Sequence, residues 1–188
     1  MFRHLVSGAT SVTLALLGSL VAAQSAEAQG YSYYALTPCR LVDTRQDPGS
    51  PTNLGQTGWT GKLMNGHLSF VTAKGNCGIP ATGVFAVSMN VTIVNPSKGA
   101  NVRMVPADIG TMSTISTLNF LLGDTAIANG AIVPIQATGT TTGPAGPSGG
   151  VGANIGTGDV GFYLQAGPAN PPDQYWADLV VDITGYFQ

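Results

Sequence analysis

The residues best suited to chemistry lie in one short block, Thr37–Arg45, which reads T-P-C-R-L-V-D-T-R. The block holds two arginines, an aspartate and one of the two cysteines, in a chain with only 9% charged residues. Arginine presents a planar fork of N–H donors that suits a carboxylate, and a buried carboxylate needs such a partner. We therefore predict a structural ion-pair cluster among Arg40, Asp43, Arg45, Asp178 and Asp182.

Asp178 and Asp182 also allow a catalytic interpretation. Residues at even spacing in a strand share one face, and two carboxylates on one face can hydrolyse a glycosidic bond. Asp182, however, lies between the apolar run 179–181 and Ile183. A carboxylate paired to an arginine therefore fits this sequence better than a catalytic pair.

Other signatures of catalysis are missing from the sequence. His67 is the only histidine after residue 28, and there is no H-E-x-x-H motif or phosphate-binding loop. Side-chain oxygens of Asn90, Asn119 and Asn129 could contribute to a calcium site, but the D-x-D-x-D-G spacing is missing. We expect these amides to hydrogen-bond backbone groups, and we predict no enzyme activity, no cofactor and no metal.

The N-terminus predicts export. Arg3 and His4 form a short basic region, an apolar run follows over 12–23, and an A-x-A cleavage site ends at Ala28. The apolar run is shorter than the roughly 20 residues of a membrane span. We expect residues 1–28 to be a signal peptide and the protein to be secreted, with no membrane span.

Export changes how the cysteines are interpreted. An oxidising compartment favours a disulfide between Cys39 and Cys77 over a reactive thiol. A structural zinc site would need four ligands, which two cysteines do not supply. Closing a loop of this length contributes about 4 kcal/mol to stability in the chain-entropy model.

Charge limits the possible partners. Without residues 1–28 the chain holds 6 basic and 8 acidic residues in 160. So few basic residues exclude nucleic acid, whose phosphates require a basic patch. A surface with little charge provides little repulsion between molecules, and suits a protein that packs against copies of itself or lies in a matrix.

The elements that position these residues are predicted to be strands. Period-two alternation dominates, with turn signals every 8–12 residues, and the 26 glycines and 12 prolines interrupt any helical periodicity. We predict one all-β domain over 29–188, a β-sandwich or jelly roll of about nine or ten strands. The runs 84–94 and 101–106 are predicted to pair as a hairpin. The other expected strands lie around Tyr33 and Leu41 and at 67–73, 116–121, 131–136, 160–165 and 175–187.

Two segments interrupt the strand pattern. Residues 47–61 form a predicted surface loop that carries Trp59. Residues 138–158 form a low-complexity insert, in which glycine briefly recurs at every third position. A collagen triple helix needs many more such triplets, so we predict a loop.

Aromatic residues supply two further candidate surfaces. Tyr31, Tyr33 and Tyr34 follow the cleavage site, on a short segment that could pair with the sheet edge of another subunit. An aromatic platform for an extracellular glycan is the alternative, built from Trp59, Tyr175 and Trp176.

Taken together, these blocks resemble a family of exported bacterial modules known mainly as uncharacterised. The motifs that carry the resemblance span nearly the whole chain after residue 28, at 38–45, 77–81, 86–92, 116–120, 128–134 and 181–187. The resemblance implies an extracellular structural or adhesive role and no established active site. The insert at 138–158 and the tyrosine-rich start depart from the family pattern.

The sequence therefore predicts a secreted structural protein that self-associates into a filament, sheath or surface layer by strand pairing. A carbohydrate-binding or adhesion module is the alternative function.

Overall fold

The computed structural model describes residues 30–46, 61–109, 114–135, 154–155, 158–167 and 174–188. Residues 31–188 belong to one compact unit, and its described part contains strands and no helix. The strands are β1 (Tyr33–Asp43), β2 (Leu63–Met64), β3 (Leu68–Val71), β4 (Ala86–Val94), β5 (Ala100–Pro106), β6 (Leu118–Phe120), β7 (Ala126–Pro134), β8 (Asn154–Ile155), β9 (Val160–Gln165) and β10 (Trp176–Phe187).

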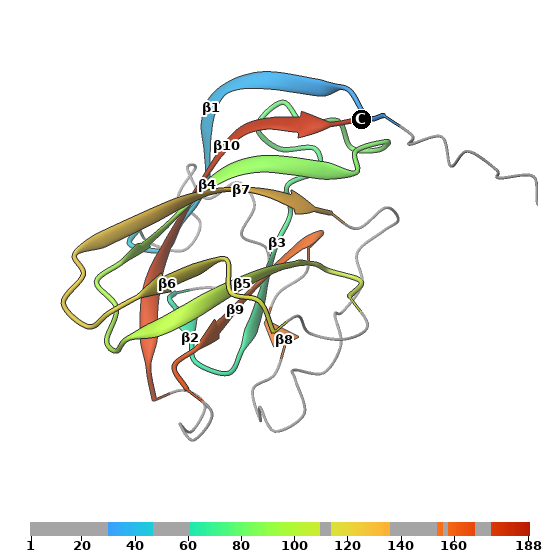
Figure 1. The fold of residues 1–188 in the computed structure, drawn as a ribbon. Coiled ribbons are helices and arrows are strands. Elements are labelled where there is room, and N and C mark those ends of the chain that lie inside the picture. Colours follow the sequence, from blue (N-terminus) through green and yellow to red (C-terminus); the bar gives the residue numbers. More distant parts are fainter. Residues whose placement is uncertain (1–29, 47–60, 110–113, 136–153, 156–157, 168–173) are drawn as a thin grey trace, which may run out of the picture. The chain divides into compact units, whose positions relative to one another are not determined.

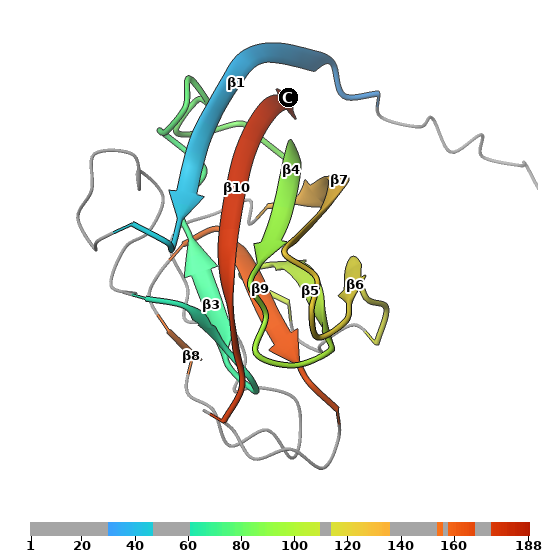
Figure 2. The same ribbon diagram turned by 90° about the vertical axis from the view of Figure 1, so that its left-hand side faces the viewer.

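Two sheets pack face to face, so the predicted β-sandwich is confirmed (Figure 1). The first sheet has the order β1-β10-β4-β7, with β2 paired to the start of β10. Figure 2 shows its four long strands side by side. The second sheet has the order β6-β5-β9-β3-β8, in which β3 and β8 are parallel.

Alternation along the strands builds the core between the sheets. In β4, Val87, Met89, Val91 and Ile93 are buried, while the residues between them are partly exposed. The inward side chains of β10 alternate in the same way, and they join those of β4, β5 and β9 in one cluster. Burial of these β-branched and aliphatic groups is the main stabilising contribution to the sandwich.

The predicted hairpin between 84–94 and 101–106 is wrong. β4 pairs with β10 and β7 in the first sheet, whereas β5 pairs with β6 and β9 in the second. The segment between β4 and β5 therefore crosses from one sheet to the other. A short turn-like segment between two strands does not by itself distinguish a hairpin from a crossing of this kind.

Two other expectations need correction. The predicted strand at 131–136 begins five residues earlier in the structure, at Ala126. The predicted loop at 138–158 contains β8, whose pairing with β3 is too short to produce a periodic sequence signal. Residues 1–28, the predicted signal peptide, lie outside the described residues. Among the residues that are described, no helix is long and apolar enough to cross a membrane.

Candidate functional site

A β-bulge organises the charged block on β1. The register of β1 against β10 shifts between Arg40 and Val42, and Leu41 and Val42 both enter the core. Residues three apart on a regular strand point to opposite faces, so Arg40 and Asp43 could not otherwise meet. With the bulge, Arg40 Nη1 lies 2.9 Å from Asp43 Oδ2.

The cluster pairs two arginines with two aspartates. Arg40 also binds Asp182 with two hydrogen bonds, from Nε to Oδ1 at 2.5 Å and from Nη2 to Oδ2 at 3.2 Å. Arg45 likewise donates two hydrogen bonds to Asp43, from Nε to Oδ1 at 2.8 Å and from Nη2 to Oδ2 at 2.6 Å. The Asp43 side chain is fully buried, so both guanidinium groups compensate its charge.

These contacts shift the proton equilibria of the cluster. The hydrogen bonds from Arg45 hold the pKa of Asp43 below its ordinary value, and they outweigh the opposing effect of burial. The bond to Asp182 raises the pKa of Arg40, and the bond to Asp43 raises the pKa of Arg45. Asp43 and both arginines therefore stay charged at neutral pH.

Asp178 forms a separate pair that the sequence did not predict. Its Oδ2 lies 2.6 Å from Lys62 Nζ, and its Oδ1 accepts a hydrogen bond from Thr44 Oγ1. Thr44 Oγ1 in turn accepts a hydrogen bond from the backbone N–H of Leu179, next along β10. Lys62 lies just before β2, and no motif marked it as the partner of a residue 116 positions away.

The two cysteines form a disulfide beside this cluster. The sulfur atoms of Cys39 and Cys77 are 2.08 Å apart and the Cα atoms 5.6 Å apart. Cys77 has a φ of 53°, in the left-handed region, and Gly78 follows at 79°. Ile79 N donates to Asn76 O, closing a tight turn around these two residues. The bridge therefore ties β1 to this turn, and the cysteines, arginines and aspartates together form a structural clamp.

The tyrosine-rich segment is paired within its own chain. Tyr33 lies opposite Phe187 and Tyr34 opposite Tyr186 in the β1–β10 ladder, with ring centroids 5.0 Å apart in both pairs. Tyr31 stacks on a ring outside this ladder, that of Phe85, at 4.2 Å. These tyrosines remain nearly half exposed, but they do not form a free strand for another subunit.

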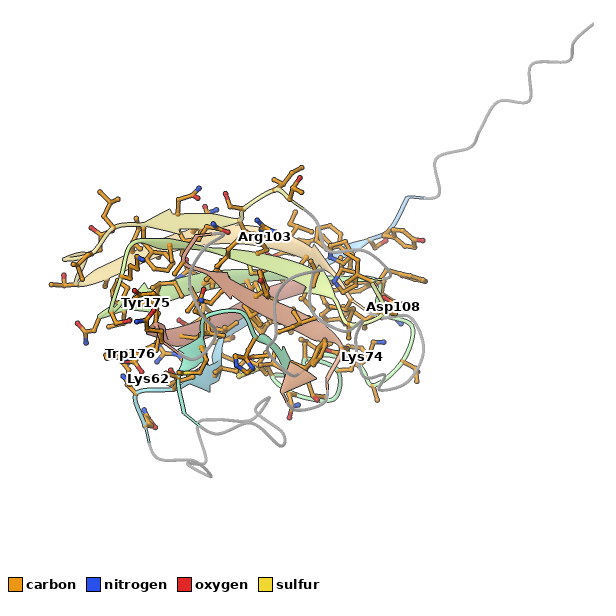
Figure 3. The ribbon with its side chains drawn as sticks, turned by 90° about the horizontal axis from the view of Figure 1, so that it is seen from below. Lys62, Lys74, Arg103, Asp108, Tyr175 and Trp176 are labelled. Atoms are coloured by element: carbon orange, nitrogen blue, oxygen red, sulfur yellow. A yellow bond between two sulfur atoms is a disulfide. The ribbon has the colours of Figure 1, made fainter. Side chains whose placement is uncertain are left out.

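The predicted aromatic platform is only partly described. Figure 3 shows Tyr175 and Trp176 close to Lys62 at one end of the structure. Lys62 Nζ lies 3.9 Å from the centroid of the Trp176 ring, and Lys98 Nζ lies 4.2 Å from that of Tyr175. A lysine thus occupies one face of each ring, where a sugar would stack. Trp59 lies outside the described residues.

The asparagines and the candidate metal ligands have ordinary environments. Asn129 Nδ2 donates to Thr117 O at 2.8 Å, and Asn90 Nδ2 lies 3.5 Å from Thr92 Oγ1. Asn119 is exposed on β6. Across the described ranges, no group of three or more His, Cys, Asp or Glu residues is placed to hold a metal ion.

The outer edge of β7 is the surface that the sequence did not reveal. Its ladder with β4 runs without a register shift from Ala126 to Pro134, and β4 is its only ladder partner among the described strands. Just beyond the ladder ends, Ile135 N donates to Phe85 O and Asn95 N to Thr125 O.

These two bonds fix the direction of the backbone groups of β7. Hydrogen-bonded pairs alternate in an antiparallel ladder, so the odd-numbered residues of β7 bond to β4. The even-numbered residues direct their backbone N–H and C=O groups away from the sheet, except that Pro134 has no N–H. Their side chains lie on its exposed outer face: Ala126, Ala128, Gly130, Ile132 and Pro134.

The other three sheet edges carry features that block pairing. β6 and β8 contain three and two residues. β1 has two register shifts, and it carries Pro38, which has no N–H. One arginine lies within β1 and a second follows it, at Arg40 and Arg45. Short strands, bulges, proline and charge are the usual protections of an edge. β7 has no charge and no bulge, and its one proline, Pro134, is its last residue, so β7 is the least protected edge of the described structure.

Exposed apolar side chains occur on β7 and in the turn before it. Ile132 on β7 is 63% exposed, and Leu121 and Leu122, in the turn before β7, are about 70% exposed. Gly130 adjoins a hollow of about 400 Å³, bordered by polar side chains on the outer face of the sheet: Ser88, Asn90 and Thr184. The candidate assembly surface is therefore β7 with its preceding turn.

Comparison with protein-family models, with curated proteins and with solved structures gives no match to this chain. Its function therefore has to be inferred from the residues and contacts described above.

Proposed function

We propose that this protein is a secreted structural subunit that self-associates outside the cell by β-strand pairing, without catalysis. The observation that carries the proposal is the open edge of β7, a nine-residue strand with no charge, bulge or ladder partner on its outer side among the described residues. Such an edge is a template for pairing with another chain.

Three other features support this function. The chain is nearly uncharged, so copies repel each other weakly. The disulfide and ion-pair clamp suits a protein exposed to an oxidising exterior. The resemblance to exported bacterial modules implies an extracellular structural or adhesive role. A filament, sheath or surface layer would require a second contact between copies in addition to β7.

Glycan binding is the weaker alternative. Its candidate rings at Tyr175 and Trp176 each have one face against a lysine. A sugar that stacked on that face of Trp176 would have to displace Lys62, which is also held by its ion pair with Asp178.

The test is sedimentation velocity and negative-stain microscopy of residues 29–188 over a wide concentration range. We expect concentration-dependent association, which Ile132→Lys abolishes because it places a charge on the open edge. Tyr34→Lys is the matched control on β1, at the opposite edge of the same sheet, and should associate like the native chain. Strictly monomeric native protein at every concentration would contradict the proposal.

A further inference from the structure

We propose that the partner at β7 is β7 of a second copy, paired antiparallel across a two-fold axis that passes beside Gly130. This inference rests on the proposed function, self-association by strand pairing. It adds the edge, the symmetry and the register of the contact.

The backbone of β7 is complementary to itself. A two-fold axis brings the same edge of both copies together in antiparallel orientation, so each outward N–H can meet an outward C=O. Gly130 is the central residue of the strand Ala126–Pro134. Full overlap of the two strands therefore places Gly130 of one copy opposite Gly130 of the other.

The side chains fit the same register. Ala128 lies opposite Ile132 of the second copy, so a small side chain meets a large one on the outer face. If β7 carried a charged side chain near the axis, self-pairing would bring it close to the same side chain of the second copy. Two like charges at such a distance are destabilising. Among residues 126–134 there is no charged side chain.

Gly130 has no explanation within a single copy. It is not among the glycines with positive φ, and a Cβ added there would meet nothing within 4 Å. Glycine weakens a strand interior, and it often marks a place where another backbone approaches closely. In the proposed pair, the two Gly130 residues lie opposite each other with no side chain between them.

The alternative partner edge is β1 of the next copy, which would give an open, head-to-tail assembly. The two register shifts of β1 and its Pro38 interrupt the regular spacing that β7 would need. β7 therefore matches itself better than it matches β1.

The register can be tested by single cysteine substitutions in residues 29–188. Both native cysteines are in the disulfide, so Gly130→Cys would add one thiol. Residues opposite each other in a hydrogen-bonded pair have Cα atoms about 5.5 Å apart, within the range of a disulfide. Ala128 and Ile132 lie two positions from the axis. The Cα atom of each residue is therefore about 14 Å from the Cα atom of the same residue in the second copy.

Under mild oxidation at associating concentrations, we expect Gly130→Cys to run as a covalent dimer on a non-reducing gel. Ala128→Cys and Ile132→Cys should each remain monomeric on the same gel, and an equal mixture of the two should give the mixed dimer. Two results would overturn the register while leaving self-association intact. In the first, all three variants associate but Gly130→Cys gives no covalent dimer. In the second, they associate and Ile132→Cys alone gives a covalent dimer. Monomeric behaviour of the native protein and all variants would overturn both.

Discussion

At the scale of single residues, Asp43 is the centre of the clamp. Its buried carboxylate accepts hydrogen bonds from both Arg40 and Arg45. Both arginines are partly exposed, at 35% and 45%, and Arg40 keeps its bonds to Asp182, so Asp43→Asn removes charge-assisted hydrogen bonds without burying an unpaired charge. We expect Asp43→Asn to lower the free energy of unfolding by about 2 kcal/mol in urea at pH 7. Asp108→Asn, at an exposed position, should change it by less than about 0.5 kcal/mol.

The lowered pKa of Asp43 also predicts how stability changes with pH. Because the carboxylate is favoured in the folded state, its contribution is fully present above the pKa of an unfolded aspartate, about 3.9. The contribution is lost as the pH falls through the lower folded-state pKa. The difference in unfolding free energy between the native chain and Asp43→Asn should therefore shrink below about pH 4. An unchanged difference down to about pH 2 would show that the charge of Asp43 is not what stabilises the fold.

The sequence predicted the members of the clamp better than their pairing. Arginine and aspartate are conspicuous in an almost uncharged chain, so composition alone identified most members of the cluster. The pairing of Asp178 with Lys62 could not be predicted, because it depends on how the segment before β2 lies against β10. The bulge that turns Arg40 and Asp43 to one face also has no sequence signature of its own.

At the scale of the elements, the disulfide is expected to hold β1 to the turn at Cys77. Replacing both cysteines by serine should lower the free energy of unfolding by about 4 kcal/mol, because the bridge joins residues 38 positions apart. Chemical denaturation of the double variant and of the reduced native protein measures this loss. Equal stability of oxidised and reduced protein would mean that the ion pairs alone fix β1.

The two sides of β7 should respond differently to proline. Ala128 directs its N–H to the open edge, so Ala128→Pro removes no ladder bond within one copy, and we expect a folded protein that no longer associates. Ala131 lies opposite Met89 in the ladder, so Ala131→Pro should cost at least about 1–3 kcal/mol through a lost bond to β4. Thermal unfolding and sedimentation of the two variants separate these effects. Equal destabilisation by both would show that the outward and inward groups have been assigned wrongly.

Strand alternation predicted β4 well, because one face of this strand is buried and the other is partly exposed. It failed at the start of β7, because Ala126, Ala128 and Gly130 are small and exposed and so give no alternation of polar and apolar residues. The same feature hid the candidate assembly surface. An open edge is a property of sheet order, which depends on contacts between strands that are distant in sequence.

At the scale of the whole molecule, the clamp and the edge have different tasks. The disulfide, the ion pairs and the paired tyrosines fix β1 within the first sheet, while the outer side of β7 has no ladder partner among the described strands. Two copies joined at β7 would form one continuous sheet that ends on both sides at a protected β1. Such an arrangement limits strand pairing to two copies, so any larger assembly must use another surface.

The most direct test of this account is amide hydrogen exchange along β7, measured by NMR below and above the concentration at which the protein associates. The inward amides bond to β4 and should be protected at both concentrations: Ile127, Asn129, Ala131 and Val133. The outward amides should exchange rapidly in the monomer and become protected on association: Ala126, Ala128, Gly130 and Ile132. Outward amides that stay rapidly exchanging in the associated protein, with new protection on β1 instead, would contradict pairing through β7.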